Sequence, residues 1–169
     1  MYNKFLAYLY RRWARIRLEF PRLWKNYLYQ SLLATVMVFI VLLLLTVENA
    51  VVIASIGATA FIVFTMPRSI TAKPRRVIGG HLVGLLAGSL CALIPHSTTL
   101  SSITVFALAV GISICLMVAL DVEHPPASGT ALGVAITGFS PGVMVTIITS
   151  SLVLSLAHHF SKKFLRDLT

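Results

Sequence analysis

The chain has 169 residues, of which 57% are hydrophobic and only 11% are charged, and its formal net charge is +9. A soluble domain has about 25% charged residues, so this composition excludes an ordinary soluble domain, and the high apolar content excludes intrinsic disorder. We therefore expect an all-α integral membrane protein with one membrane domain.

The first 25 residues differ from the rest because they are rich in arginine. Apolar residues recur there at steps of three or four, and arginines occupy the other face. This pattern predicts a basic amphipathic helix over residues 1–25 that lies on the membrane surface. Pro21 is expected to bend the chain from that surface into the bilayer.

Six apolar segments follow, and together they form a single transmembrane domain over residues 26–158. A spanning helix needs about 20 residues, so the second and fifth segments are short. Acidic residues interrupt the pattern after the first segment, at Glu48, and after the fourth, at Asp121 and Glu123. The expected segments are 27–47, 50–66, 77–94, 101–120, 127–139 and 143–157.

The basic residues form three clusters, which lie before residue 26, between residues 68 and 76, and in the tail over residues 159–169. With six crossings all three clusters fall on one side of the membrane, as the positive-inside rule requires. Both termini are then cytoplasmic, and a bacterial inner membrane is the expected location. The lipid bilayer accounts for this charge, so we expect no nucleic-acid partner.

The two halves of the domain, residues 27–95 and 101–158, resemble each other. Each half has a long span, an acidic break, a short segment rich in small residues and a further span. Three spans make an odd number of crossings, so the pattern predicts a 3+3 inverted repeat, which is typical of transporters and channels. Small residues at intervals of four predict close helix packing. The same faces would also suit a homo-oligomer.

The stretch that follows the fourth segment is the candidate site. Two prolines can begin a helix but not continue one, so a helix is expected to start near Pro126 with His124 bracing an irregular turn before it. A helix N-terminus can bind an anion, although polar residues there can also act as simple caps. The predicted turn comprises Glu123, His124, Pro125 and Pro126, and the predicted substrate-binding residues of the two short segments are Ser55, Gly57, Thr59, Ser128, Gly129 and Thr130.

Basic residues are expected at the cytoplasmic mouth of the second and third spans. They could attract a small anion or simply anchor the loop to lipid headgroups. His81 could be a neutral hydrogen-bonded residue or a proton-coupled switch. Glu48 and Glu123 could be interfacial carboxylates in water, or they could be a pair of gates or proton sites. The residues of this predicted mouth are Arg68, Lys73, Arg75, Arg76 and His81.

The sequence contains no pattern that predicts an enzyme. The histidines do not follow a zinc-binding spacing, and there is no P-loop, nucleophile elbow or dinucleotide fingerprint. We expect no cofactor and no metal site. Cys91 and Cys115 lie in apolar runs and are expected to be free thiols.

The triplet of His124, Pro125 and Pro126, followed by Ala-Ser-Gly-Thr-Ala, resembles the signature of the HPP family of integral membrane proteins. Two further stretches, 54–60 and 73–81, fit that family, and the resemblance covers about residues 27–157. It implies a transporter or channel for a small inorganic anion, with nitrite as the leading candidate. The alternative is a membrane scaffold or assembly protein that transports nothing.

Overall fold

The computed structural model describes residues 2–44 and 50–168, and within them it contains six α-helices and no strand. The all-α prediction is therefore confirmed for this part of the chain, whereas the predicted break at Glu48 lies outside the described residues. The helices are α1 (Tyr2–Leu44), α2 (Ala50–Thr65), α3 (Pro74–Ala92), α4 (Thr99–Ala119), α5 (Pro126–Thr137) and α6 (Pro141–Ser161), with a 3₁₀ turn η1 (Ile70–Ala72) before α3.

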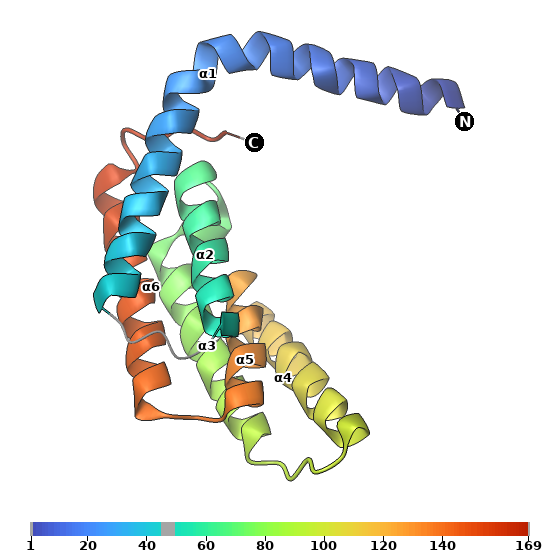
Figure 1. The fold of residues 1–169 in the computed structure, drawn as a ribbon, viewed down its shortest axis with the longest axis vertical. Helices are drawn as coiled ribbons and strands as arrows, with labels where there is room; N and C mark the ends of the chain where they lie inside the picture. Colours follow the sequence, from blue (N-terminus) through green and yellow to red (C-terminus); the bar gives the residue numbers. More distant parts are fainter. Residues whose placement is uncertain (1, 45–49, 169) are drawn as a thin grey trace.

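The N-terminal region differs from the expected two elements, because α1 is one continuous helix that includes Pro21. A proline in a helix removes one backbone hydrogen bond and bends the helix without necessarily ending it. Figure 1 shows the result: the second half of α1 packs along the bundle, and its first half bends away from the bundle. The surface location of this first half remains a prediction.

Successive helices of the bundle run in opposite directions, so the C-terminus lies at the end of the bundle from which α1 projects (Figure 1). Among the residues that the structure describes, three segments are long and apolar enough to cross a membrane, namely Arg17–Leu43, Thr99–Ala119 and Pro141–Ser161. The second and fifth helices are short, as expected, with 16 and 12 residues. Twelve residues of helix span roughly 18 Å, which is less than a hydrocarbon core of about 30 Å.

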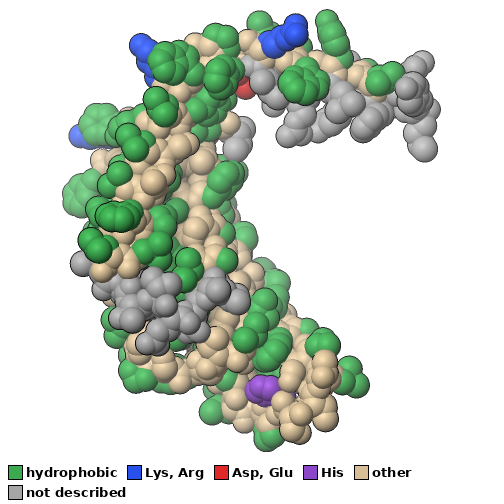
Figure 2. All heavy atoms as spheres, in the orientation of Figure 1, with side chains coloured by type: hydrophobic (Ala, Val, Ile, Leu, Met, Phe, Trp, Pro, Cys, Tyr) green, Lys and Arg blue, Asp and Glu red, His purple; other side chains and the backbone are tan. Residues whose placement is uncertain are grey.

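Charged and apolar side chains are separated on the surface. Figure 2 shows lysine and arginine side chains around the end from which α1 projects, and none at the opposite end of the same face. Large apolar side chains cover the outer surfaces of the helices, including Leu93 at 79% exposure and Leu100 at 75%. Extensive apolar exposure of this kind suits contact with lipid.

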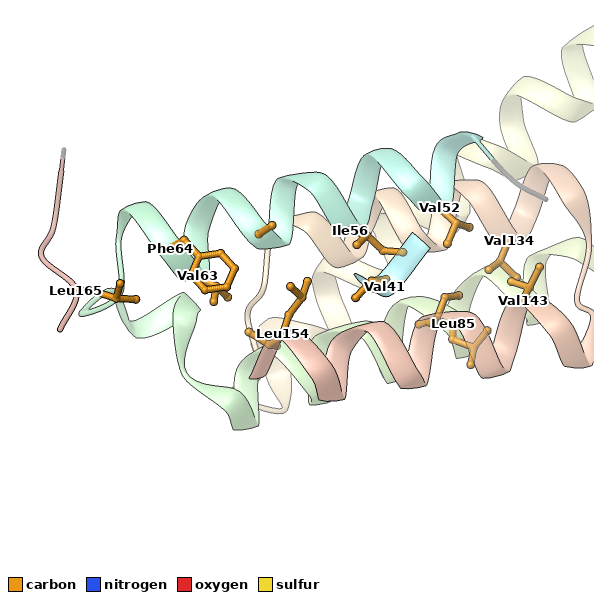
Figure 3. Packing of buried hydrophobic residues seen from close by; sticks show 13 residues of the cluster. Val41, Val52, Ile56, Val63, Phe64, Leu85, Val134, Val143, Leu154 and Leu165 are labelled. Atoms are coloured by element: carbon orange, nitrogen blue, oxygen red, sulfur yellow. The ribbon is translucent and has the colours of Figure 1, made fainter. Parts of the chain in front are cut away.

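The apolar core joins five helices and the C-terminal tail. Figure 3 shows Val41 of α1, Ile56 of α2, Leu85 of α3 and Leu154 of α6 among the side chains of one buried cluster. Leu165, which follows α6, is buried in the same cluster. The tail is therefore packed against the bundle.

Hydrogen bonds hold this tail at a second point. The side-chain amide of Gln30 in α1 donates to the carbonyl of Phe64 at 2.5 Å and to that of Arg166 at 2.8 Å. The backbone N–H of Leu168 donates to the carbonyl of Thr65 at 2.8 Å. The tail thus ties α1 to the end of α2.

Glycines set the distance between α3 and α5. A β-carbon on Gly84 would collide with the carbonyl oxygen of Ala127, and one on Gly88 would lie 2.5 Å from the carbonyl oxygen of Ala131. Small residues therefore let these two backbones touch, as the spacing of four predicts for the third span. Gly111 in α4 differs, because a β-carbon there would have no atom within 4 Å.

Candidate functional site

Five polar side chains meet in the interior where α2, α3 and α5 come together, and we call them the polar cluster. Each is at most 4% exposed. Hydrogen bonds connect all five side chains, so the interior of this apolar bundle contains a continuous polar region. The members are Ser55 and Thr59 from α2, His81 from α3, His124 from the turn before α5, and Thr130 from α5.

The distances define an unbranched series of side chains. Ser55 Oγ lies 2.6 Å from Thr130 Oγ1, which lies 2.9 Å from His81 Nδ1. Nε2 of His81 lies 2.9 Å from Thr59 Oγ1, which in turn lies 3.0 Å from His124 Nε2. The series ends at the backbone, because Nδ1 of His124 lies 2.9 Å from the carbonyl oxygen of Thr71 in η1.

The local sequence explains why these groups converge. Ser55 and Thr59 are four residues apart, so they share one face of α2. Gly80 makes room for the turn, because a β-carbon there would lie 2.6 Å from the β-carbon of His124. The N-terminal halves of α2 and α5 also lie close together, since a β-carbon on Gly129 would be 3.5 Å from that of Ser55.

The turn between α4 and α5 is irregular, as the two prolines predict. The helix α4 ends at Ala119, Asp121 has a left-handed backbone with φ of 54°, and α5 begins at Pro126. Nδ1 of His124 bonds from this turn to the carbonyl of Thr71, and the role of His124 in bracing the turn stays a prediction. Burial lowers the pKa of His124 to about 4, so this side chain is neutral at physiological pH.

An ion-pair group lies at the same turn. Arg76 pairs with both Asp121 and Glu123, and Arg75 pairs with Asp121. The Arg76 side chain is only 10% exposed, whereas that of Arg75 is 67% exposed. Two basic residues of the predicted mouth are therefore neutralised by carboxylates. The sequence indicates a helix break and interfacial carboxylates at this turn, but no local pattern predicts their pairing with Arg75 and Arg76.

The remaining residues of the predicted mouth do not form one group. His81 lies in the polar cluster and not among the arginines. Lys73 precedes the first residue of α3, and its backbone carbonyl accepts a hydrogen bond from the N–H of Arg76 at 2.8 Å. Arg68 lies apart from them, in a hollow of about 390 Å³ that is lined by Glu19, Arg22, Leu23, Arg68, Arg166 and Asp167.

The six predicted substrate-binding residues divide into two groups. Ser55, Thr59 and Thr130 belong to the polar cluster, and Gly129 lies beside Ser55. Gly57 is exposed, and a β-carbon added to it would have no atom within 4 Å. The hydroxyl of Ser128 donates to the carbonyl of Pro125 at 2.7 Å. The structure thus brings together the hydroxyls that face the interior.

Comparisons with known proteins identify the chain as a membrane protein of one family. A family model described as "HPP, transmembrane region" matches residues 21–166. Two curated transmembrane proteins of Dictyostelium discoideum are similar to the chain: one is 38% identical over 88 residues, and the other is 33% identical over 85 residues. These matches cover 52% and 50% of this chain but only 31% and 27% of the two relatives. No solved structure matches.

Proposed function

We propose that this chain, which belongs to the HPP transmembrane family, passes a small inorganic anion across the membrane, with nitrite as the leading candidate. The observation that carries the proposal is the polar cluster, which lies where the N-terminal halves of α2 and α5 meet. Polar groups inside a membrane bundle are costly, and they commonly mark a substrate or ion pathway.

The chemistry of the cluster suits a small anion. Hydroxyl groups from Ser55 and Thr130 can donate hydrogen bonds to an anion. None of these donors carries a full charge, so they would replace part of the water shell of an anion and hold it weakly. Weak binding favours passage over retention.

In this arrangement the hydroxyls bond one another, so an anion would enter by replacing one of these bonds. The contact of 2.6 Å between Ser55 and Thr130 lies beside Gly129, since a β-carbon on Gly129 would be 3.5 Å from that of Ser55. Gly57 has open space around it, and Gly129 is flanked only by Ser55. Separation of α2 from α5 at these small residues would expose the cluster hydroxyls.

The remaining features follow from the same proposal. The protein would reside in a bacterial inner membrane with both termini cytoplasmic, and it would act as a carrier or channel and not as an enzyme. It would need neither a cofactor nor a metal, and its partners would be the bilayer and the anion, with no nucleic acid. A homo-oligomer could form through the exposed small residues of α4, including Gly111.

One observation favours the rival function of a scaffold that transports nothing. Every polar-cluster side chain has a hydrogen-bond partner within the protein. A network whose hydrogen bonds are all made within the protein could have a purely structural role, which is to hold the helices together. Transport assays are therefore needed to decide between the two functions.

The deciding experiment measures anion flux into vesicles that contain the purified full chain. We expect flux of nitrite, and we expect Gly129→Leu to abolish it, because a larger side chain there fills the approach to Ser55. Gly142→Leu is the matched control and should leave flux unchanged, since Gly142 is exposed at the start of α6 and belongs neither to the polar cluster nor to the small-residue surface of α4. The absence of flux for nitrite, nitrate, formate and chloride in the parent chain would favour the scaffold.

A further inference from the structure

The hydrogen bonds of the polar cluster have a direction that is imposed by one end of the series. The carbonyl oxygen of Thr71 can only accept, so Nδ1 of His124 must donate to it. In a neutral imidazole the other nitrogen is then an acceptor. Nε2 of His124 therefore accepts from the hydroxyl of Thr59, which lies 3.0 Å away.

The same logic fixes the rest of the series. Once Thr59 has donated its only proton to His124, it accepts from Nε2–H of His81 at 2.9 Å. Nδ1 of His81 then accepts from the hydroxyl of Thr130 at 2.9 Å, and Thr130 accepts from Ser55 at 2.6 Å. Both rings are neutral, and each has a single allowed tautomer.

A second acceptor lies within reach of the Thr59 hydroxyl. The carbonyl oxygen of Ser55 is 3.0 Å from Thr59 Oγ1, but the neutral arrangement gives it no proton from that hydroxyl. If Nε2 of His124 takes up a proton, Thr59 can turn to the Ser55 carbonyl and accept from both imidazoles. Every other hydrogen bond keeps its partners and its direction.

We infer that the polar cluster is a proton-binding site, in which one proton is held at Nε2 of His124 while the Thr59 hydroxyl turns from His124 to the carbonyl of Ser55. The proton comes from the aqueous phase and forms an N–H bond, and no other bond is made or broken except hydrogen bonds. A network with a purely structural role needs one arrangement of its protons, whereas this one has two arrangements that differ by a single hydroxyl rotation.

His124 is the member that can take the proton at the least disturbance. Protonation of His81 at Nδ1 would require Thr130 to give up its donation and to turn toward Ser55 Oγ. Ser55 would then have to turn as well, and the described residues offer its hydroxyl no other acceptor. Two rotations and one lost hydrogen bond make this alternative unfavourable.

The charges around His124 leave the added proton uncompensated. His81 of α3 faces it with a ring-centroid distance of 5.2 Å, and the turn and the start of α3 supply the paired groups Arg75, Arg76, Asp121 and Glu123, whose formal charges cancel. The helices α2 and α5 contain no titratable side chain, and His158 of α6 is bonded to the carbonyl of Pro67. An anion in the cluster would neutralise this positive charge, so proton binding and anion binding would be coupled. This coupling rests on the proposed function.

The test is histidine ¹⁵N NMR of the full chain in lipid nanodiscs between about pH 8 and pH 3, a range that brackets ordinary and lowered histidine pKa values. Near pH 8 we expect His124 as the Nδ1–H tautomer and His81 as the Nε2–H tautomer. On acidification Nε2 of His124 should gain a proton before His81 does. The opposite tautomer at His124, or titration of His81 first, would overturn the inference.

Two variants at one position separate a proton site from structural packing. Thr59→Val keeps the shape of the side chain but cannot accept the new N–H, so the titration midpoint of His124 should fall by about one unit or more. Thr59→Ser retains the hydroxyl and should restore the midpoint. An unchanged midpoint in the valine variant contradicts the inference. If the valine variant does not fold, the tautomers of the parent chain and the titration midpoint of the serine variant still test the inference.

Anion flux measured on the same preparation separates this inference from the proposed function. Titration of His124 without flux of any anion would support the proton site and count against transport. Flux without titration of His124 would support transport and overturn the proton site. Flux together with titration, accompanied by alkalinisation of the outer medium as the anion enters the vesicle, would support both.

Discussion

Replacement of Gly84 by alanine should destabilise the bundle, because the two backbones at this point already touch. The added β-carbon would collide with the carbonyl oxygen of Ala127 and lie 3.2 Å from its carbonyl carbon and 3.4 Å from the backbone nitrogen of Ala131. Backbone atoms cannot rotate away as a side chain can, so α3 and α5 must separate. Overpacking costs about 1–3 kcal/mol, and we expect the upper end of that range.

The helix propensity of alanine opposes this cost. Alanine is favoured over glycine in a helix by about 1 kcal/mol, so the net loss for Gly84→Ala should be about 2 kcal/mol. Gly111→Ala carries the same propensity gain without a clash, because no atom lies within 4 Å of the added β-carbon. We therefore expect the control to be as stable as the parent chain or up to about 1 kcal/mol more stable.

Reversible unfolding of the full chain in mixed micelles, with sodium dodecyl sulfate as denaturant and circular dichroism as the signal, would measure both variants. The free energies of unfolding should differ between the two variants by about 3 kcal/mol, which is the overpacking cost alone, because both variants gain the same helix propensity. Equal stabilities for Gly84→Ala and Gly111→Ala would refute the reasoning, since they would show that contact between the backbones does not set the spacing of α3 and α5.

Other parts of the molecule lead to three more predictions. Arg76→Met should lower the free energy of unfolding by about 2 kcal/mol, because Glu123 loses its ion-pair partner and Asp121 keeps only Arg75, whereas Arg75→Met at an exposed pair should cost less than about 1 kcal/mol in the same assay. Burial lowers the pKa of His124 from 6.5 to about 4, so the neutral side chain should contribute its full stability above pH 6.5 and lose this contribution as the pH falls through about 4. Free energies of unfolding measured at several pH values would check this pH dependence, and equal free energies at pH 6.5 and pH 4 would contradict it. Gln30→Leu should release the C-terminal tail, because the tail loses about 1–2 kcal/mol of hydrogen bonding. The rate of proteolysis in the tail should then rise roughly 5–30-fold, and an unchanged cleavage rate would count against this role of Gln30.

The sequence predicts the helices well because hydrophobicity and proline act locally. Apolar runs locate all the bundle helices, and prolines mark the first positions of α3, α5 and α6. The separate surface helix over residues 1–25 is the exception. The structure shows one helix through Pro21, because a single lost hydrogen bond does not end a long helix.

The site was only partly predictable, since its contacts depend on how the helices pack. The hydroxyls of Ser55, Thr59 and Thr130 could be selected because they lie in the two short segments. Their bonds to His81 join residues 22 and 49 positions apart, and no local pattern reports such a pairing. The placement of His81 near basic residues in the sequence was therefore a poor guide to its position in space.

The tie between Gln30 and the C-terminal tail has a consequence for how the protein is made. Gln30 enters the membrane with the first span, long before Arg166 is synthesised, and its two backbone partners lie 34 and 136 residues later in the chain. The tail can reach Gln30 only if the last helix ends on the side where the first one began, which requires an even number of crossings. A chain that inserted one helix wrongly would leave this amide without its final partner. The tie thus stabilises only a topology in which α1 begins and α6 ends on the same side, and it can form only after residue 166 has been synthesised.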